Sequence, residues 1–112
     1  MARARNKVIA GDYEGDYVTN TILGGLQIGS KTVSKSTIEM YELITEEKMK
    51  SGTSAVFRGA VGYAILGPVG VLAGLSAKNK EINTVAIQWK DGKKSLIEVD
   101  GKLYKAIVAA LF

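Results

Sequence analysis

The feature that most constrains the fold of this chain is an uncharged stretch of 19 residues, Gly59–Ala77, which lies between Arg58 and Lys78. It holds five of the 13 glycines and the only proline of the chain. A solvent-exposed helix would not retain so many glycines, because each costs about 1 kcal/mol relative to alanine. The flanking sequence has the composition of ordinary β-structure. The stretch is therefore predicted to be a helix-forming insert that offsets the glycine cost by close packing.

Small residues recur at four-residue spacing in this stretch, as in the GxxxG pair of Gly70 and Gly74. This spacing places them on one helical face and lets a second backbone approach closely. A single membrane-spanning helix would reach about 28 Å, close to the thickness of a bilayer core. However, Gly67 and Pro68 interrupt it at its middle, and only seven of the 19 residues are Val, Ile or Leu. A hairpin of two short helices over residues 53–78, here called the insert, fits better, because Pro68 suits the first turn of its second helix.

Three placements of the insert remain open: on the sheet of its own domain, against a second copy or another protein, or in one leaflet of a membrane. In a protein contact, the interaction surface is expected to consist of the small residues and the proline, namely Gly59, Gly62, Gly67, Pro68, Gly70 and Gly74. In a membrane contact, three cations are expected to hold the headgroups, namely Arg58, Lys78 and Lys80.

Neither cysteine nor histidine occurs among the 112 residues. Disulfides and thiolate metal sites are thereby excluded, and the commonest general base is missing. The carboxylates of Asp12, Glu14 and Asp16 alternate, which on a strand would place them on one solvated face. We expect no enzyme, no cofactor and no metal site. The composition fits a cytoplasmic protein, and the insert leaves membrane association open.

The remaining sequence predicts a small antiparallel sheet. Residues 8–22 mix Val, Ile and Tyr with Gly, Asp and Asn, which is typical of strands and tight loops, and residues 36–47 favour a further strand. Asp91-Gly92 lies between two alternating runs and predicts a hairpin with a two-residue type I′ turn. In that register Trp89 faces Lys94, whose stem is expected to cover the indole, and Ile87 faces Leu96.

The last residues, 100–112, predict an amphipathic helix. Asp100 occupies the position of an N-cap. The apolar residues that follow recur at helical spacing and form one stripe, made of Leu103, Ile107, Ala110 and Leu111.

This order of strands, a marked hairpin and one C-terminal amphipathic helix resembles that of pleckstrin-homology-like domains. Together with the glycine-zipper segment, the run TVAIQWKDGKKSLIEVDGKLYKAI is similar to small bacterial and phage proteins of that general type. The resemblance covers residues 8–112, interrupted by the insert, and implies a roll or partial barrel closed by the last helix, with binding as its function. The length of the chain predicts one α+β domain over residues 1–112. We count five or six strands, where that fold has seven.

The expected function is a non-enzymatic interaction module that self-associates or binds a protein partner through the insert. A module of this kind, if encoded by a phage, would inhibit a host protein by obstruction. The alternative is a peripheral membrane protein whose insert enters the bilayer. Nucleic acid is not an expected partner, because only Trp89 with Lys90, Lys93 and Lys94 approaches the mixture of exposed aromatic and basic residues that such binding needs.

Overall fold

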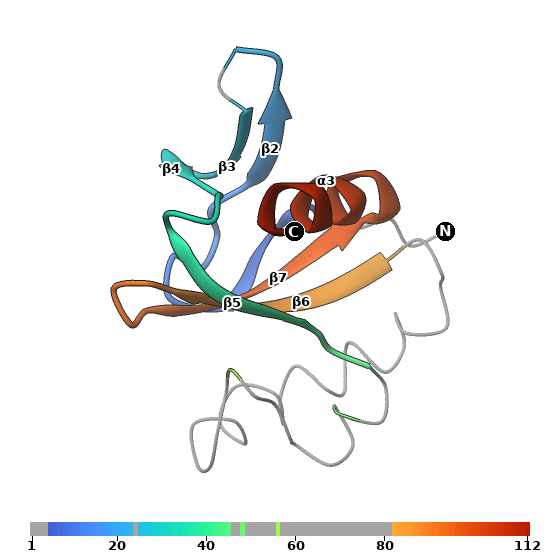
Figure 1. Ribbon diagram of the computed structural model, residues 1–112. Coiled ribbons are helices and arrows are strands. Elements are labelled where there is room, and N and C mark those ends of the chain that lie inside the picture. Colours follow the sequence, from blue (N-terminus) through green and yellow to red (C-terminus); the bar gives the residue numbers. More distant parts are fainter. Residues whose placement is uncertain (1–4, 24, 46–47, 49–55, 57–81) are drawn as a thin grey trace.

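The computed structural model describes residues 5–23, 25–45, 48, 56 and 82–112 (Figure 1). Within these ranges the chain forms two antiparallel sheets, ordered β1-β7-β6-β5 and β2-β3-β4, and a helix that follows the last strand. The predicted class, a small α+β domain with a C-terminal helix, is confirmed. The elements are β1 (Lys7–Gly11), β2 (Val18–Thr21), β3 (Gly25–Ile28), β4 (Lys31–Thr32), β5 (Ile38–Leu43), β6 (Ile82–Trp89), β7 (Lys94–Asp100) and α3 (Gly101–Leu111).

The described part of the chain has seven strands, more than the five or six expected. The strand that is hardest to find in the sequence is β4, which has only two residues. Its ladder pairs Lys31 with Ile28 and Thr32 with Gln27. Two residues show no hydrophobic alternation, so sequence periodicity has nothing to detect at this position.

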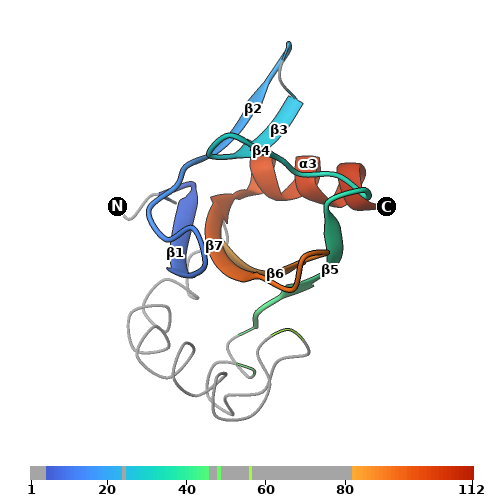
Figure 2. The same ribbon diagram turned by 90° about the vertical axis from the view of Figure 1, so that its left-hand side faces the viewer.

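The two sheets meet at corners where consecutive strands change sheet. At the β1–β2 corner, Lys7 pairs with Tyr17 in an isolated bridge, and the Val18 N–H donates to the Asn6 carbonyl at 2.8 Å. At the β4–β5 corner, the Thr37 hydroxyl donates to the Thr32 carbonyl at 2.7 Å. Helix α3 lies between the sheets and contacts both (Figure 2). The corners and the helix together enclose the main core.

The main core lies between α3 and the two sheets. Its fully buried helical residue is Ile107. The strands add Val8, Val18, Leu26, Ile28, Ile38, Val85, Ile87, Trp89, Ile97 and Val99. A second cluster, made of Ala10, Ile44, Val56, Ala86 and Leu96, lies apart from the main core. Because neighbouring strand residues point to opposite faces, Val85 and Ala86 belong to different clusters, and the four-stranded sheet is apolar on both faces.

The hairpin predicted at Asp91-Gly92 forms, but its turn type and its register differ from the prediction. The Trp89 N–H donates to the Lys93 carbonyl at 2.8 Å, and the Gly92 N–H donates to the Trp89 carbonyl at 3.0 Å. The loop therefore has three residues. Gly92 has a φ of 93°, and Asp91 is not among the residues with positive φ, so the turn is not type I′.

The longer loop shifts the pairing by one residue, so that Ile87 faces Ser95 and Ala86 faces Leu96. The prediction that Ile87 faces Leu96 is therefore wrong, as is the pairing of Trp89 with Lys94. A shift of one residue moves a side chain to the other face of the sheet. Leu96 consequently belongs to the second cluster, while Ile97 belongs to the main core.

The C-terminal helix forms as predicted. Asp100 is its N-cap, with an extended backbone, and its carboxylate accepts a hydrogen bond from the Leu103 N–H at 2.8 Å. The Asn6 side chain holds the same residue from the other side, because its amide oxygen accepts from the Asp100 N–H at 2.9 Å. The cap thereby fixes the start of α3 against the end of β7.

The insert, residues 53–78, lies outside the described residues except for Val56. The Val56 side chain is fully buried in the second cluster. The helical hairpin predicted for the insert is therefore neither shown nor excluded, and its boundaries stay a prediction. In the part of the chain that the structure does describe, no helix is both long and apolar enough to cross a bilayer.

Candidate functional site

A cluster of polar and aromatic side chains lies at one end of the two sheets, where three connections meet β4 and the end of β6. We call it the tyrosine–lysine site. A cavity of about 330 Å³ opens there. It is lined by residues from the β1–β2 loop, β4, the β4–β5 loop and the β6–β7 turn, namely Tyr13, Lys31, Thr37, Trp89, Lys90 and Asp91.

Tyr13 is held in place by a tight turn. Its φ is 66°, and it lies within the turn over residues 12–15, where the Asp16 N–H donates to its carbonyl at 3.0 Å. A non-glycine residue with positive φ is uncommon and needs support from its surroundings. The Tyr13 ring receives that support from the edge of the Trp89 ring, with centroids 5.5 Å apart and planes at 86°.

Trp89 in turn is held by a network of hydrogen bonds. Its indole N–H donates to the Ser95 hydroxyl at 3.0 Å, and that hydroxyl donates to the Asp12 carbonyl at 2.7 Å. The Asp12 carboxylate accepts from the Lys94 N–H at 2.8 Å. The hydroxyl of Ser95, which is fully buried, thus acts as acceptor and donor in one network that ties the β1–β2 turn to β7.

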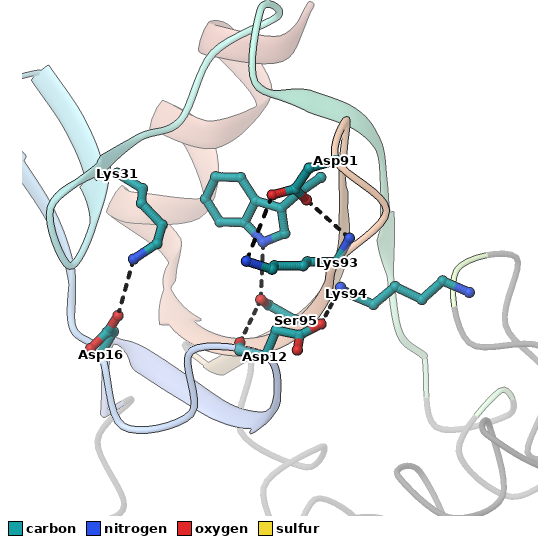
Figure 3. Close-up of polar contacts among 8 residues, drawn as sticks. Asp12, Asp16, Lys31, Asp91, Lys93, Lys94 and Ser95 are labelled. Atoms are coloured by element: carbon teal, nitrogen blue, oxygen red, sulfur yellow. Dashed lines mark hydrogen bonds and ion pairs between the residues drawn. The ribbon is translucent and has the colours of Figure 1, made fainter.

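Two ammonium groups gather on the Tyr13 ring. The Lys31 Nζ lies 3.9 Å from the ring centroid and the Lys93 Nζ lies 5.3 Å from it. Lys31 and Lys93 extend toward each other across the site, whereas Lys94 points away (Figure 3). The predicted contact of Lys94 with the indole is therefore not formed. The cations lie on tyrosine, because tryptophan is only 4% exposed.

The carboxylates near these cations hold them only loosely. Lys31 is 3.8 Å from Asp16 and Lys93 is 4.0 Å from Asp91, and all four side chains are substantially exposed. Exposed pairs at such distances contribute about 0–1 kcal/mol. Hydrogen bonding to the Tyr13 hydroxyl, the electrostatic interaction with that group and the Asp91 carboxylate raise the pKa of Lys93 above its ordinary value. Its ammonium is therefore charged at neutral pH.

This arrangement is suited to binding an anion. Three lysines border the cavity or its tyrosine wall, namely Lys31, Lys90 and Lys93. An anionic ligand could replace the carboxylates of the two weak ion pairs at a small cost in free energy. Ammonium groups provide charge and up to three donors each. The aromatic floor adds an apolar surface beside the charge.

The three alternating carboxylates do not share a strand face as expected. Asp12 and Glu14 lie in the turn after β1, and Asp16 follows it before β2 begins. Asp12 is bonded to the Lys94 backbone and Asp16 pairs with Lys31. A turn forms here because Gly11, the last residue of β1, and Gly15 both adopt positive φ, which ends the extended backbone of the strand. Among the described residues no group of three acidic side chains is arranged to hold a metal ion.

The residues predicted for the interaction surface and for headgroup contact are not among those that the structure describes. Gly59, Gly62, Gly67, Pro68, Gly70, Gly74, Arg58, Lys78 and Lys80 all lie outside the described residues. Of the residues weighed for nucleic-acid binding, Lys90 and Lys93 border the tyrosine–lysine site, but the buried Trp89 presents no open ring face for a base.

The β2–β3 hairpin has an apolar tip that was not predicted. Ile22 and Leu23 are 102% and 101% exposed, and the hairpin projects beyond α3 (Figure 1). The signal was present in the sequence, because two large aliphatic residues directly precede Gly24-Gly25, a pair typical of turns. Exposed apolar residues at a projecting turn are candidates for contact with another molecule.

Comparison of the whole chain with protein-family models, with curated proteins and with solved structures finds no match in any of the three.

Proposed function

We propose that this chain is a non-enzymatic interaction module that self-associates, or binds a protein partner, through the insert. The observation that carries the proposal is the pairing of β5 with β6. Leu43 is paired with Val85, and the Ile44 N–H donates to the Thr84 carbonyl at 2.8 Å. The segment between these strands therefore leaves and rejoins the same end of one strand pair.

This geometry argues against a single membrane crossing by Gly59–Ala77. One crossing would put β5 and β6 on opposite sides of a bilayer, and the two strands are hydrogen-bonded neighbours. It is compatible with an appendage that folds back on itself and offers its small residues to a second molecule. The buried Val56 supports attachment of the base of the insert to the second cluster.

The test is light scattering after size exclusion, without detergent, on the intact chain and on a variant with Gly59–Ala77 replaced by a short Gly/Ser linker. We expect a defined oligomer for the intact chain and a folded monomer for the variant. Gly70→Leu with Gly74→Leu should also dissociate the oligomer, because bulky side chains prevent close backbone approach. An intact chain that runs as a clean monomer would overturn self-association.

The second candidate, a peripheral membrane protein, is favoured by the tyrosine–lysine site. Its loosely paired lysines are suited to anionic headgroups. The test is co-sedimentation with vesicles of phosphatidylcholine, with and without phosphatidylserine. Lys31→Glu with Lys93→Glu should abolish binding to the anionic vesicles. The control, Lys102→Glu with Lys105→Glu on the exposed side of α3, makes the same charge change.

We further propose that the fold is of the pleckstrin-homology-like type. Two features support this: strands that are consecutive in the chain are neighbours within or between the sheets, and one helix packs between the sheets. An experimental structure of the whole chain, superposed on domains of that type, tests it. The suggestion of a phage inhibitor rests on the sequence resemblance alone and stays a prediction.

A further inference from the structure

The four-stranded sheet has an edge that pairs with no other strand in the described part of the chain. β5 is the outermost strand of the order β1-β7-β6-β5. The Ile44 N–H donates toward β6, to the Thr84 carbonyl. In an antiparallel ladder, residues bonded to the partner alternate with residues whose N–H and C=O point outward. Tyr41 and Leu43 therefore direct their main-chain groups away from β6.

A groove follows this edge. Its volume is about 460 Å³, and it lies between β5 and the last turn of α3, because Leu111 lines it together with Ile38 and Tyr41. Lys35 and Lys90 also line the groove, with Glu39 on its wall. Neither lysine forms an ion pair with any described residue. The groove thus combines an apolar wall, an excess of positive charge and an open row of main-chain donors and acceptors.

We propose that the edge of β5 binds an extended segment of another protein, which adds to the sheet as a further strand. The main chain of the segment would bond to the outward groups of Tyr41 and Leu43. An apolar side chain would pack against Tyr41 and Leu111, and an acidic side chain would meet Lys35 and Lys90. Addition of a strand is the recognition mode in which main-chain bonds provide affinity and side-chain pockets provide specificity.

The groove favours a peptide strand over other occupants for two reasons. Outward N–H and C=O groups of an edge strand are satisfied by another strand or by water, and lipid tails offer them nothing. Lys35 and Lys90, which form no ion pair with another described residue, make the groove complementary to an acidic residue and unfavourable for a basic one. The edge is separate from the insert, so this inference goes beyond the proposed function.

The experiment selects binders from a phage-displayed library of random peptides of about ten residues, which is long enough for one added strand. The intact chain is the bait. We expect selected peptides to alternate apolar residues and to carry an acidic residue. In hydrogen exchange, a synthetic selected peptide should slow the amides of Tyr41 and Leu43 by about tenfold or more, because bonded amides exchange only on opening. The Ile44 amide, already bonded to Thr84, should change little.

Two pairs of variants make the test specific. Leu43→Pro removes an outward N–H at an edge position, where proline is tolerated, and should abolish binding, whereas Leu43→Val should not. Lys35→Glu with Lys90→Glu should weaken binding by about tenfold or more, whereas Lys102→Glu with Lys105→Glu should leave it nearly unchanged. If Leu43→Pro does not fold, the variant Lys35→Glu with Lys90→Glu still tests the proposal.

Three results would overturn the proposal: a selection without binders, slowed exchange that bypasses Tyr41 and Leu43, or peptides released by Lys31→Glu with Lys93→Glu and unaffected by the edge variants. None of these results bears on light scattering by the linker variant. Failure of the edge and failure of the insert are therefore distinguishable.

Discussion

At the scale of single residues, the turn after β1 depends on two glycines in the same unusual conformation but in different surroundings. Gly11 has a φ of 85°, and a Cβ added there would lie 2.6 Å from the Lys94 carbonyl oxygen. Gly15 has a φ of 93° and open space around it. We expect Gly15→Ala to lower the free energy of unfolding by about 1–2 kcal/mol, the cost of left-handed backbone for alanine. Gly11→Ala should cost clearly more, because β1 must also move away from β7.

Urea unfolding of the two variants measures this difference directly. The comparison is controlled by design, because both substitutions add the same methyl group at positive φ within one turn. Equal losses of stability would contradict the close approach of Gly11 to β7.

The buried network beneath the tyrosine–lysine site makes a second prediction. Ser95→Ala leaves the Trp89 indole N–H without its partner in a buried position, which costs about 1–3 kcal/mol. Trp89→Phe with Ser95→Ala should cost less than the sum of the two single substitutions, because the unsatisfied donor is then absent. Urea unfolding of the four proteins gives the coupling. Strict additivity would show that the bond contributes nothing.

The residues of this site could not have been assembled from the sequence. Tyr13, Lys31 and Trp89 are far apart in the chain, and no spacing rule connects them. The only local signal, Trp89 with its neighbouring lysines, predicted an indole–lysine contact. The cations lie instead on Tyr13, a residue that the sequence placed only among strand and loop residues.

At the scale of elements, the N-cap of α3 offers a prediction with a conservative control. Asp100→Ala removes the acceptor of the Leu103 N–H and of the Asn6 amide, and should lower the free energy of unfolding by about 1–2 kcal/mol. Asp100→Asn retains a capping oxygen and should lose much less. Chemical denaturation followed by helical circular dichroism tests both. If Asp100→Asn lowered the free energy of unfolding as much as Asp100→Ala, the charge of Asp100, and not its capping hydrogen bond, would stabilise the helix.

Elements with a local cause were predicted well, and those with a non-local cause were not. The cap of α3 and the hairpin of β6 and β7 follow from residues next to each other in the chain. The register of that hairpin depends on whether the loop has two or three residues, and Asp91-Gly92 is compatible with both. A wrong register is usually recognisable because it would expose apolar side chains to solvent. β7 is buried on both faces, so a shift of one residue leaves its apolar side chains buried in either register.

At the scale of the whole molecule, the second cluster links the insert, through Val56, to the four-stranded sheet. The order of strands, insert, hairpin and helix could be read along the chain, but the apolar second face of the four-stranded sheet could not. Ala86 and Leu96 are fully buried there, together with Val56. The sequence offered an internal contact, a partner contact or a membrane contact for the insert, and at Val56 the contact is internal.

The last prediction follows from this link. Val56→Ala removes two buried methyl groups, which should cost about 1–3 kcal/mol through lost burial and the cavity left behind. The partly buried Val108 of α3 is the control, and its replacement by alanine should cost less, because alanine favours the helix. The same substitution is made in the linker variant that lacks Gly59–Ala77. If Val56 packs on the four-stranded sheet independently of the rest of the insert, Val56→Ala should lower the free energy of unfolding by the same amount in both proteins. A cost that disappears in the linker variant would show that Val56 is held by the remainder of the insert, and unfolding of the four proteins in urea distinguishes the two arrangements.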